Sequence, residues 1–268
     1  MANAWLVGLK GLFTVLGSVM VATLIFTICT DGLPFRKDLL TPWMVATLVD
    51  FYINVVPLAA WVLYRESSWL CAILWIILLV CFGSITTCAY IVMRFLKLTS
   101  SQESLQDFMY FVLLRHPDEY GCKTLDKDGM EQKWKHSYVW TFRILFSALG
   151  FLMLGTLIYT LLSDGSPFRE ELFTPWMKAT LIDFYINVVA LSVWVNYKES
   201  SWISSIFWII LLISFGSITT CFFIAWKLFQ LNLEDPVYLV LSNCGNRAEN
   251  RYKFVGKRCN TGLDEQGS

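Results

Sequence analysis

Two acid–amide pairs lie inside apolar stretches of this chain, where polar side chains are unusual. Asp50 is followed by Asn54, and Asp183 is followed by Asn187 at the same spacing. A helix turns about 100° per residue, so residues four apart share a face. Lipid cannot satisfy a polar face, so this face must contact protein or water. An acid within an apolar helix is by default the mark of an ion or proton path, although ion pairing and hydrogen bonding between helices are the simpler alternatives.

The two pairs belong to two copies of one sequence unit. Residues 30–98 align with residues 163–231 at a constant offset of 133, and 43 of these 69 positions are identical. Each copy contains the string T-P-W-M-x-A-T-L-x-D-F-Y-I-N, which begins at Thr41 and again at Thr174. A threonine followed by proline is typical of a helix N-cap and first helical position. The repeat therefore predicts two equivalent helices, each of which carries one pair.

The composition indicates that these helices lie in a membrane. Hydrophobic residues make up 56% of the 268 residues and charged residues only 16%, whereas a soluble domain carries about 25% charged residues. Six apolar runs approach or exceed the roughly 20 residues that a helix needs to cross a bilayer. They lie at 5–29, 43–64, 70–95, 138–162, 175–197 and 203–229. We predict an all-α transmembrane protein, a six-helix bundle of two tandem three-helix repeats, with the lipid bilayer as its surroundings.

The domain boundaries follow from the repeat. The first repeat covers residues 1–97 and the second covers residues 138–231. Residues 98–137 form a polar linker with a short amphipathic segment at 108–114, and residues 232–268 form a basic polar tail.

The topology depends on how many times each repeat crosses. Three crossings per repeat is an odd number, so the second copy would enter from the opposite side and the repeats would be inverted. The alternative is that one run in each repeat is re-entrant, which would make the two copies parallel. The basic tail favours a cytosolic location for both termini, although the even spread of Lys and Arg makes the positive-inside rule weak here.

Inversion would arrange the four polar residues in a line across the bilayer. The order would be Asp50, Asn54, Asn187 and Asp183, because Asp50 precedes Asn54 by about 6 Å of helix and inversion reverses the second pair. Such a line is the candidate intramembrane polar path.

Two basic residues lie near the starts of the first and fourth runs and are the candidate partners of these acids. Inverted copies would bring Lys10 to the depth of Asp183, and Arg143 to the depth of Asp50. Contacts within one repeat are the alternative, and they would pair Lys10 with Glu66 and Arg143 with Glu199. Both bases could also extend to the lipid headgroups.

The third run of each repeat contains small residues at helical spacing. The string F-G-S-I-T-T-C begins at Phe82 and at Phe215. Small residues four apart let helix backbones approach closely, which predicts a packing seam; a narrow path lined by hydroxyls is the second interpretation. The seam residues are Gly83, Ser84, Thr87, Gly216, Ser217 and Thr220.

Several functional classes receive no support from the sequence. The eight cysteines form no C-x-x-C pair and the only histidines are His116 and His136, so we expect no disulfide framework and no metal site. The chain has no G-x-S-x-G, H-E-x-x-H or P-loop motif, so we expect no enzyme and no cofactor. Lys plus Arg and Asp plus Glu both total 21, which gives no basic field for nucleic acid. A homo-oligomer or a membrane-protein partner stays open.

The repeated strings D-G-x-P-F-R, T-P-W-M-x-A-T-L-x-D-F-Y-I-N and E-S-S-W resemble a plant membrane family known as domain of unknown function 1475. The resemblance covers residues 5–242 and also implies single-copy, three-span relatives in bacteria. It implies a multi-pass membrane protein and supplies no activity and no site residues. Two hypotheses follow: a small transporter or channel for a proton, cation or small polar solute, and a non-transporting membrane scaffold or assembly factor.

Overall fold

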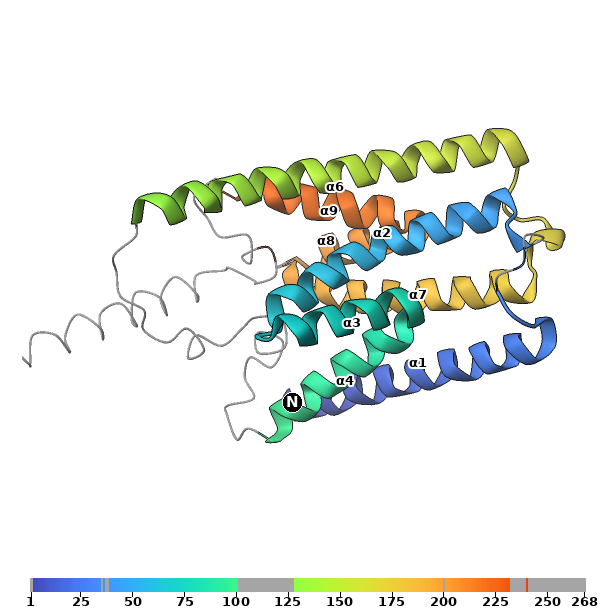
Figure 1. Cartoon of the computed structure of the whole chain (residues 1–268), viewed down its shortest axis with the longest axis horizontal. Coiled ribbons are helices and arrows are strands. Elements are labelled where there is room, and N and C mark those ends of the chain that lie inside the picture. Colours follow the sequence, from blue (N-terminus) through green and yellow to red (C-terminus); the bar gives the residue numbers. More distant parts are fainter. Residues whose placement is uncertain are drawn as a thin grey trace, which may run out of the picture.

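A computed structural model describes residues 2–34, 36, 39–100, 128–199, 201–231 and 240 (Figure 1). These residues form eight α-helices and no strand. The first repeat holds α1 (Ala2–Asp31), α2 (Pro42–Arg65), α3 (Trp69–Phe82) and α4 (Ser84–Ser100). The second holds α6 (Asp128–Asp164), the 3-10 helix η4 (Glu170–Leu172), α7 (Pro175–Lys198), α8 (Trp202–Phe215) and α9 (Ser217–Gln230). The predicted amphipathic segment at 108–114 and the basic tail lie outside the described residues, apart from Val240.

Four of the described helices are long and apolar enough to cross a membrane: α1, α2, α6 and α7. The described residues confirm the all-α prediction, but they do not contain six spanning helices. The third apolar run of each repeat is divided into two short helices, and the first of these, α3 or α8, has only 14 residues. At about 1.5 Å per residue, 14 residues extend only about 21 Å.

The third run divides because the chain folds back at a glycine. Gly83 separates α3 from α4 and has φ +51°. The Thr86 hydroxyl donates a hydrogen bond to the Leu78 carbonyl at 2.9 Å, although the two residues are eight positions apart. In a continuous helix that separation would be about 12 Å. The equivalent bond joins Thr219 to Leu211 at 2.9 Å, so α3–α4 and α8–α9 are both helical hairpins.

The two copies run in the same direction. The starts of α2 and α7 share one buried cluster, which consists of Leu39, Trp43, Met44, Leu172, Trp176 and Met177. Figure 1 shows α1 parallel to α6, and α2 parallel to α7. The predicted inversion is therefore wrong, and the parallel alternative describes the fold. The physical reason is the hairpin: it begins and ends at the same end of the bundle, so each repeat traverses the bundle only twice.

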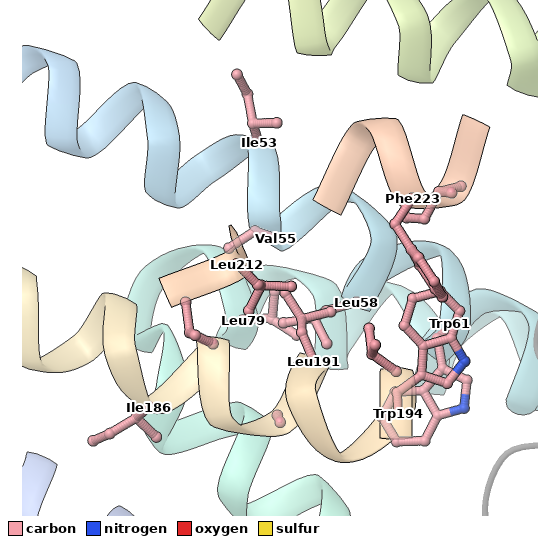
Figure 2. Close-up of a cluster of buried hydrophobic side chains, with 14 of the residues drawn as sticks. Ile53, Val55, Leu58, Trp61, Leu79, Ile186, Leu191, Trp194, Leu212 and Phe223 are labelled. Carbon is pink, nitrogen blue, oxygen red and sulfur yellow. The ribbon is translucent and has the colours of Figure 1, made fainter. Parts of the chain in front are cut away.

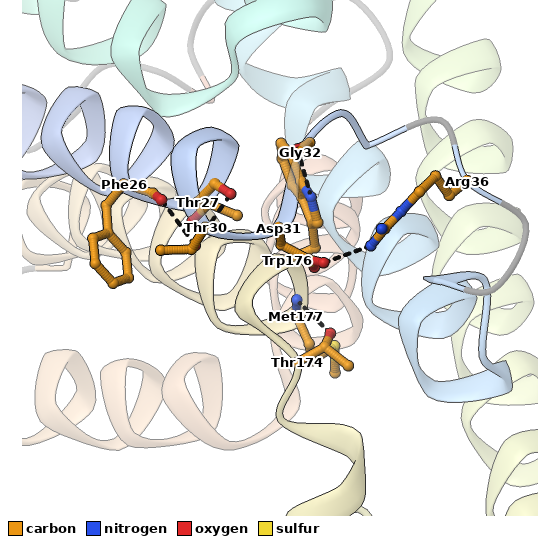
Figure 3. Close-up of polar contacts among 9 residues, drawn as sticks. All are labelled: Phe26, Thr27, Thr30, Asp31, Gly32, Arg36, Thr174, Trp176 and Met177. Carbon is orange, nitrogen blue, oxygen red and sulfur yellow. Dashed lines mark hydrogen bonds and ion pairs between the residues drawn. The ribbon is translucent and has the colours of Figure 1, made fainter.

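The repeated D-G-x-P-F-R string forms the turns after α1 and α6. Asp31 forms an ion pair with Arg36 at 2.5 Å across the turn, and Gly32 has φ +74°. The Trp176 indole of the other repeat donates to the Gly32 carbonyl at 3.2 Å (Figure 3). The predicted helix start is also confirmed, because the Thr41 side chain accepts a hydrogen bond from the Met44 backbone N–H at 3.2 Å.

The two repeats are interleaved. Helix α1 contacts α4 of its own repeat and α7 of the other, while α6 contacts α9 and α2 in the same way. Apolar side chains from α2, α3, α7 and α8 fill the space between the hairpins; Figure 2 shows Val55, Leu58, Leu79, Leu191 and Leu212 there. The hairpin tips are thus enclosed by protein on several sides.

Candidate functional site

Each acid of the polar face contacts the hairpin of the other repeat. The Asp183 carboxylate accepts hydrogen bonds from the backbone N–H of Ser84, at 2.7 Å, and from the Ser84 hydroxyl. The Asp50 carboxylate accepts the backbone N–H of Ser217 at 2.8 Å. Ser84 and Ser217 are the first residues of α4 and α9. A helix N-terminus has unpaired N–H groups and a partial positive charge, so each carboxylate acts as an N-cap supplied by the other half of the molecule.

The glycine at each hairpin tip leaves room for this contact. A Cβ built on Gly83 would collide with the Asp183 carboxylate and would lie 2.8 Å from the Phe51 ring. A Cβ on Gly216 would collide with Asp50 and would lie 2.7 Å from Phe184. The positive φ at both positions also disfavours any residue with a side chain.

The predicted seam residues divide between two tasks. Gly83, Ser84 and their counterparts form the tips just described. Thr87 and Thr220 are buried, and each hydroxyl lies 3.4 Å from the carbonyl of its own hairpin glycine. Close helix packing occurs one residue later, where a Cβ on Gly17 of α1 would lie 3.2 Å from Cys88.

The two amides, Asn54 and Asn187, lie one helical turn beyond the acids and, unlike the acids, have no hydrogen-bond partner among the described residues. Asn54 and Asn187 have exposed fractions of 0%. Among the described residues, neither the amide oxygen nor the amide nitrogen of either side chain has a hydrogen-bond partner. A buried polar group without a partner costs about 1–3 kcal/mol. The site therefore presents desolvated donors and acceptors that no described residue uses.

Each amide also lies level with a hairpin helix of the other repeat. Asp50 lies level with Ser217, and α9 runs from that point in the same direction as α2 (Figure 1). Asn54 is one turn, or about 6 Å, further along α2. It is thus level with the first turn of α9, and Asn187 is level with the first turn of α4 in the same way.

Arg143 does not contact Asp50, as the inverted arrangement would have required. Its guanidinium donates to the backbone carbonyls of Leu228 (3.0 and 2.8 Å) and Leu231 (2.8 Å). These carbonyls are at the end of α9, whereas Asp50 is at its start. Ser217 and Leu228 are 11 residues apart, which is about 16 Å of helix. The predicted pairing is wrong, and Arg143 instead stabilises the negative end of α9.

Lys10 and Asp183 are separated in the same way. Gly17 of α1 lies opposite Cys88 of α4, and α1 runs antiparallel to α4 (Figure 1). Lys10 precedes Gly17 by seven residues and so lies towards the end of α4, whereas Asp183 contacts its start. Both predicted pairs assumed inverted copies, and the parallel arrangement removes the matching depths.

Glu66 and Glu199, the acids of the alternative pairings, each form an ion pair with a base of the hairpin that follows them. Glu66 forms an ion pair with Arg94 and accepts a hydrogen bond from the Tyr90 hydroxyl at 2.9 Å. Glu199 forms an ion pair with Lys227 at 2.5 Å and accepts from Ser204 at 2.9 Å. Both pairs join the start of a hairpin to its end.

Sequence reasoning missed these two bases, although a signal was present. Arg94 and Lys227 occupy the same position of the repeat, as do Glu66 and Glu199. The pairs become neighbours only once the third run is folded back at its glycine.

Comparison with known families gives one match. The family model described as "Protein of unknown function (DUF1475)" matches residues 3–120 and 122–248. The break between the two segments falls within the predicted linker. No curated protein matches the chain, and no solved structure matches it.

Proposed function

The chain belongs to the family described as protein of unknown function 1475, and we propose from its geometry that it is a multi-pass membrane protein that lets a proton, a cation or a small polar solute cross the bilayer. Four helices of sufficient length and apolarity support the membrane location. The broken helices support the transport role, because transporters commonly build their sites from discontinuous helices near the bilayer midplane.

One observation carries the transport proposal: the unpartnered amides of Asn54 and Asn187. A membrane scaffold gains nothing from two fully buried amides whose hydrogen-bonding groups are unused, since each costs stability. A solute path needs such groups, because they replace the hydrogen bonds that the solute loses on leaving water. Their equivalent positions in both repeats place one group of this kind in each half of the molecule.

A second candidate function, a non-transporting scaffold, has its own support. The Asp50 and Asp183 carboxylates are engaged as caps on α9 and α4. Acids used in this way stabilise the association of the two halves without any transport. This candidate predicts that the purified protein carries no flux.

Flux measurements on reconstituted protein separate the two candidates. The full-length protein would be placed in liposomes, and proton, potassium and small-solute movements would be followed with dyes and light scattering. The test variants are Asn54→Leu and Asn187→Leu, which keep side-chain size and remove the amide. Matched controls are Thr47→Val and Thr180→Val, on the same helices, where each hydroxyl bonds a carbonyl of its own helix at 2.8 and 2.9 Å. Flux that the Leu variants reduce and the Val variants leave unchanged supports transport, whereas liposomes with no flux above the protein-free level support the scaffold.

We also propose that both ends of the chain are cytosolic. The start of α1 and the end of α9 lie at the same end of the bundle (Figure 1), and two traverses per repeat keep them there. Protease protection of tags at each terminus tests this; protection of one tag but not the other would contradict it.

A further inference from the structure

We infer that the solute is a small neutral molecule that both donates and accepts hydrogen bonds, such as water, ammonia or urea, and not an ion. This inference rests on the proposed transport function and narrows it. It follows from the charges that surround the two unpartnered amides, and three features of those charges decide it.

The carboxylates near the amides are already compensated. Asp50 and Asp183 each face the first N–H of a helix, where the helix dipole places about half a positive charge. A cation that approached either carboxylate would meet this positive helix end as well. Asp50 and Asp183 therefore serve as helix caps and are poor cation ligands.

The described residues also lack a side-chain cluster of the kind that holds a metal cation. Among them, no set of three or more His, Cys, Asp or Glu side chains lies close enough to hold a metal ion. One amide carbonyl in each repeat could not replace the hydration shell of an ion, since burying an unpaired charge costs far more than burying a polar group.

An anion is disfavoured by the positions of the bases. Arg94 and Lys227 form ion pairs with Glu66 and Glu199. Arg94 in α4 and Lys227 in α9 are each ten residues, or about 15 Å, from the first residue of the helix. The capping carboxylate lies at that first residue. The carboxylates of Asp50 and Asp183 lie one helical turn from the amides, and their negative charge would repel an anion.

A neutral solute matches the uncharged hydrogen-bonding groups of the two amides. Each amide side chain offers two N–H donors and one carbonyl acceptor without a net charge. Water, ammonia and urea can use both kinds of group, and they leave water at a smaller cost than ions do. The two amides would thus select by hydrogen bonding and would give no electrical current.

Stopped-flow light scattering on proteoliposomes tests this selectivity with the wild-type full chain. The probes are an inward urea gradient, an ammonia gradient read with a pH dye, and an osmotic gradient of sucrose for water. Potassium and chloride movements are measured on the same vesicles with potential-sensitive dyes. We expect faster movement of at least one neutral probe than in protein-free vesicles, and ion movement at the protein-free level.

The amide variants supply the second measurement. Asn54→Leu and Asn187→Leu should each slow the neutral probe by about tenfold, as expected for the loss of one buried hydrogen bond, while Thr47→Val and Thr180→Val keep the wild-type rate. Ion flux without neutral flux would overturn the inference and leave the proposed transport function standing. Neutral flux that both Leu variants leave unchanged would also overturn it. Absence of any flux would overturn the transport function itself.

Discussion

The Asp183 carboxylate accepts the backbone N–H of Ser84 at 2.7 Å, although the two residues are 99 positions apart. The reciprocal contact joins Asp50 to Ser217 across 167 positions. Each half of the molecule thus supplies the N-cap for a broken helix of the other half. Two copies that exchange caps in this way depend on each other for a complete structure, which explains why the acid sits inside an apolar helix.

Removing either cap should destabilise the protein. Asp183→Ala leaves the start of α4 without its acceptor, and we expect a loss of about 1–2 kcal/mol in the free energy of unfolding, typical of a deleted N-cap. Asp183→Asn should lose less, because an amide oxygen can still accept the Ser84 N–H. Thermal unfolding of the detergent-solubilised protein measures both.

The control for the cap variants is Asp31→Asn, which removes a partly exposed ion pair in the loop after α1. Exposed pairs contribute about 0–1 kcal/mol, so this change should shift the unfolding temperature only slightly. Equal effects of the alanine and asparagine variants at Asp183 would contradict the capping role.

Adding a methyl group at a hairpin tip should be more harmful. In Gly83→Ala the new Cβ meets the Asp183 carboxylate and the Phe51 ring, and the residue must also keep φ +51°. Left-handed backbone costs about 1–2 kcal/mol and overpacking about 1–3 kcal/mol, so we expect a loss of about 2–5 kcal/mol.

Gly155→Ala is the matched control for the tip variant. Gly155 lies within α6, and a Cβ there would meet nothing within 4 Å. Alanine favours a helix over glycine by about 1 kcal/mol, so this variant should be neutral or slightly more stable. A Gly83→Ala protein as stable as Gly155→Ala would show that the tip is not confined.

The parts of this fold that sequence predicts are those with local signals. Thr41 and Pro42 mark a helix start by their own chemistry, and the acid–amide spacing places Asp50 and Asn54 on one face without any tertiary information. The division of the third run has no such signal. Gly83 stands in a predicted apolar run, where glycine is common in helix-packing seams, and its positive φ and the Thr86–Leu78 hydrogen bond are seen only in the structure.

The partners of the acids could not be predicted for a related reason. Matching Arg143 to Asp50 required a topology, and the topology depended on whether the third run crosses completely. Once the run folds back, the acids meet helix starts, and Arg143 meets the Leu228 carbonyl instead. Every residue except proline has a backbone N–H, so no sequence pattern identifies one particular N–H as the partner of a carboxylate.

The ion pair between the ends of the first hairpin should contribute more than a surface pair. The side chains of Arg94 and Glu66 are only 10% and 14% exposed. Arg94→Ala would remove the guanidinium and leave the hydrogen bond from the Tyr90 hydroxyl to Glu66. Breaking a buried ion pair costs about 3–5 kcal/mol, and the partial exposure of this pair places the expected loss at about 2–3 kcal/mol. Arg94→Lys should restore most of it, because the second repeat uses Lys227 at the equivalent position.

Thermal unfolding again measures the hairpin variants, with Arg36→Ala as the control for a partly exposed loop pair. A loss no larger than that of Arg36→Ala would show that the pair between the hairpin ends is not required for stability.

Parallel and inverted repeats predict different sides of the membrane for the equivalent loops of the two repeats. Single cysteines would replace Leu33 and Phe168, which are exposed in the equivalent loops after α1 and α6, in a chain whose native cysteines are changed to serine or alanine. Parallel repeats place both loops on one side of the membrane, so a membrane-impermeant thiol reagent added outside should label both or neither. Ser67→Cys and Ser201→Cys, at the exposed starts of the two hairpins, should show the opposite accessibility. Labelling of Leu33→Cys without Phe168→Cys would restore the inverted topology and remove the reciprocal caps as an explanation of Asp50 and Asp183.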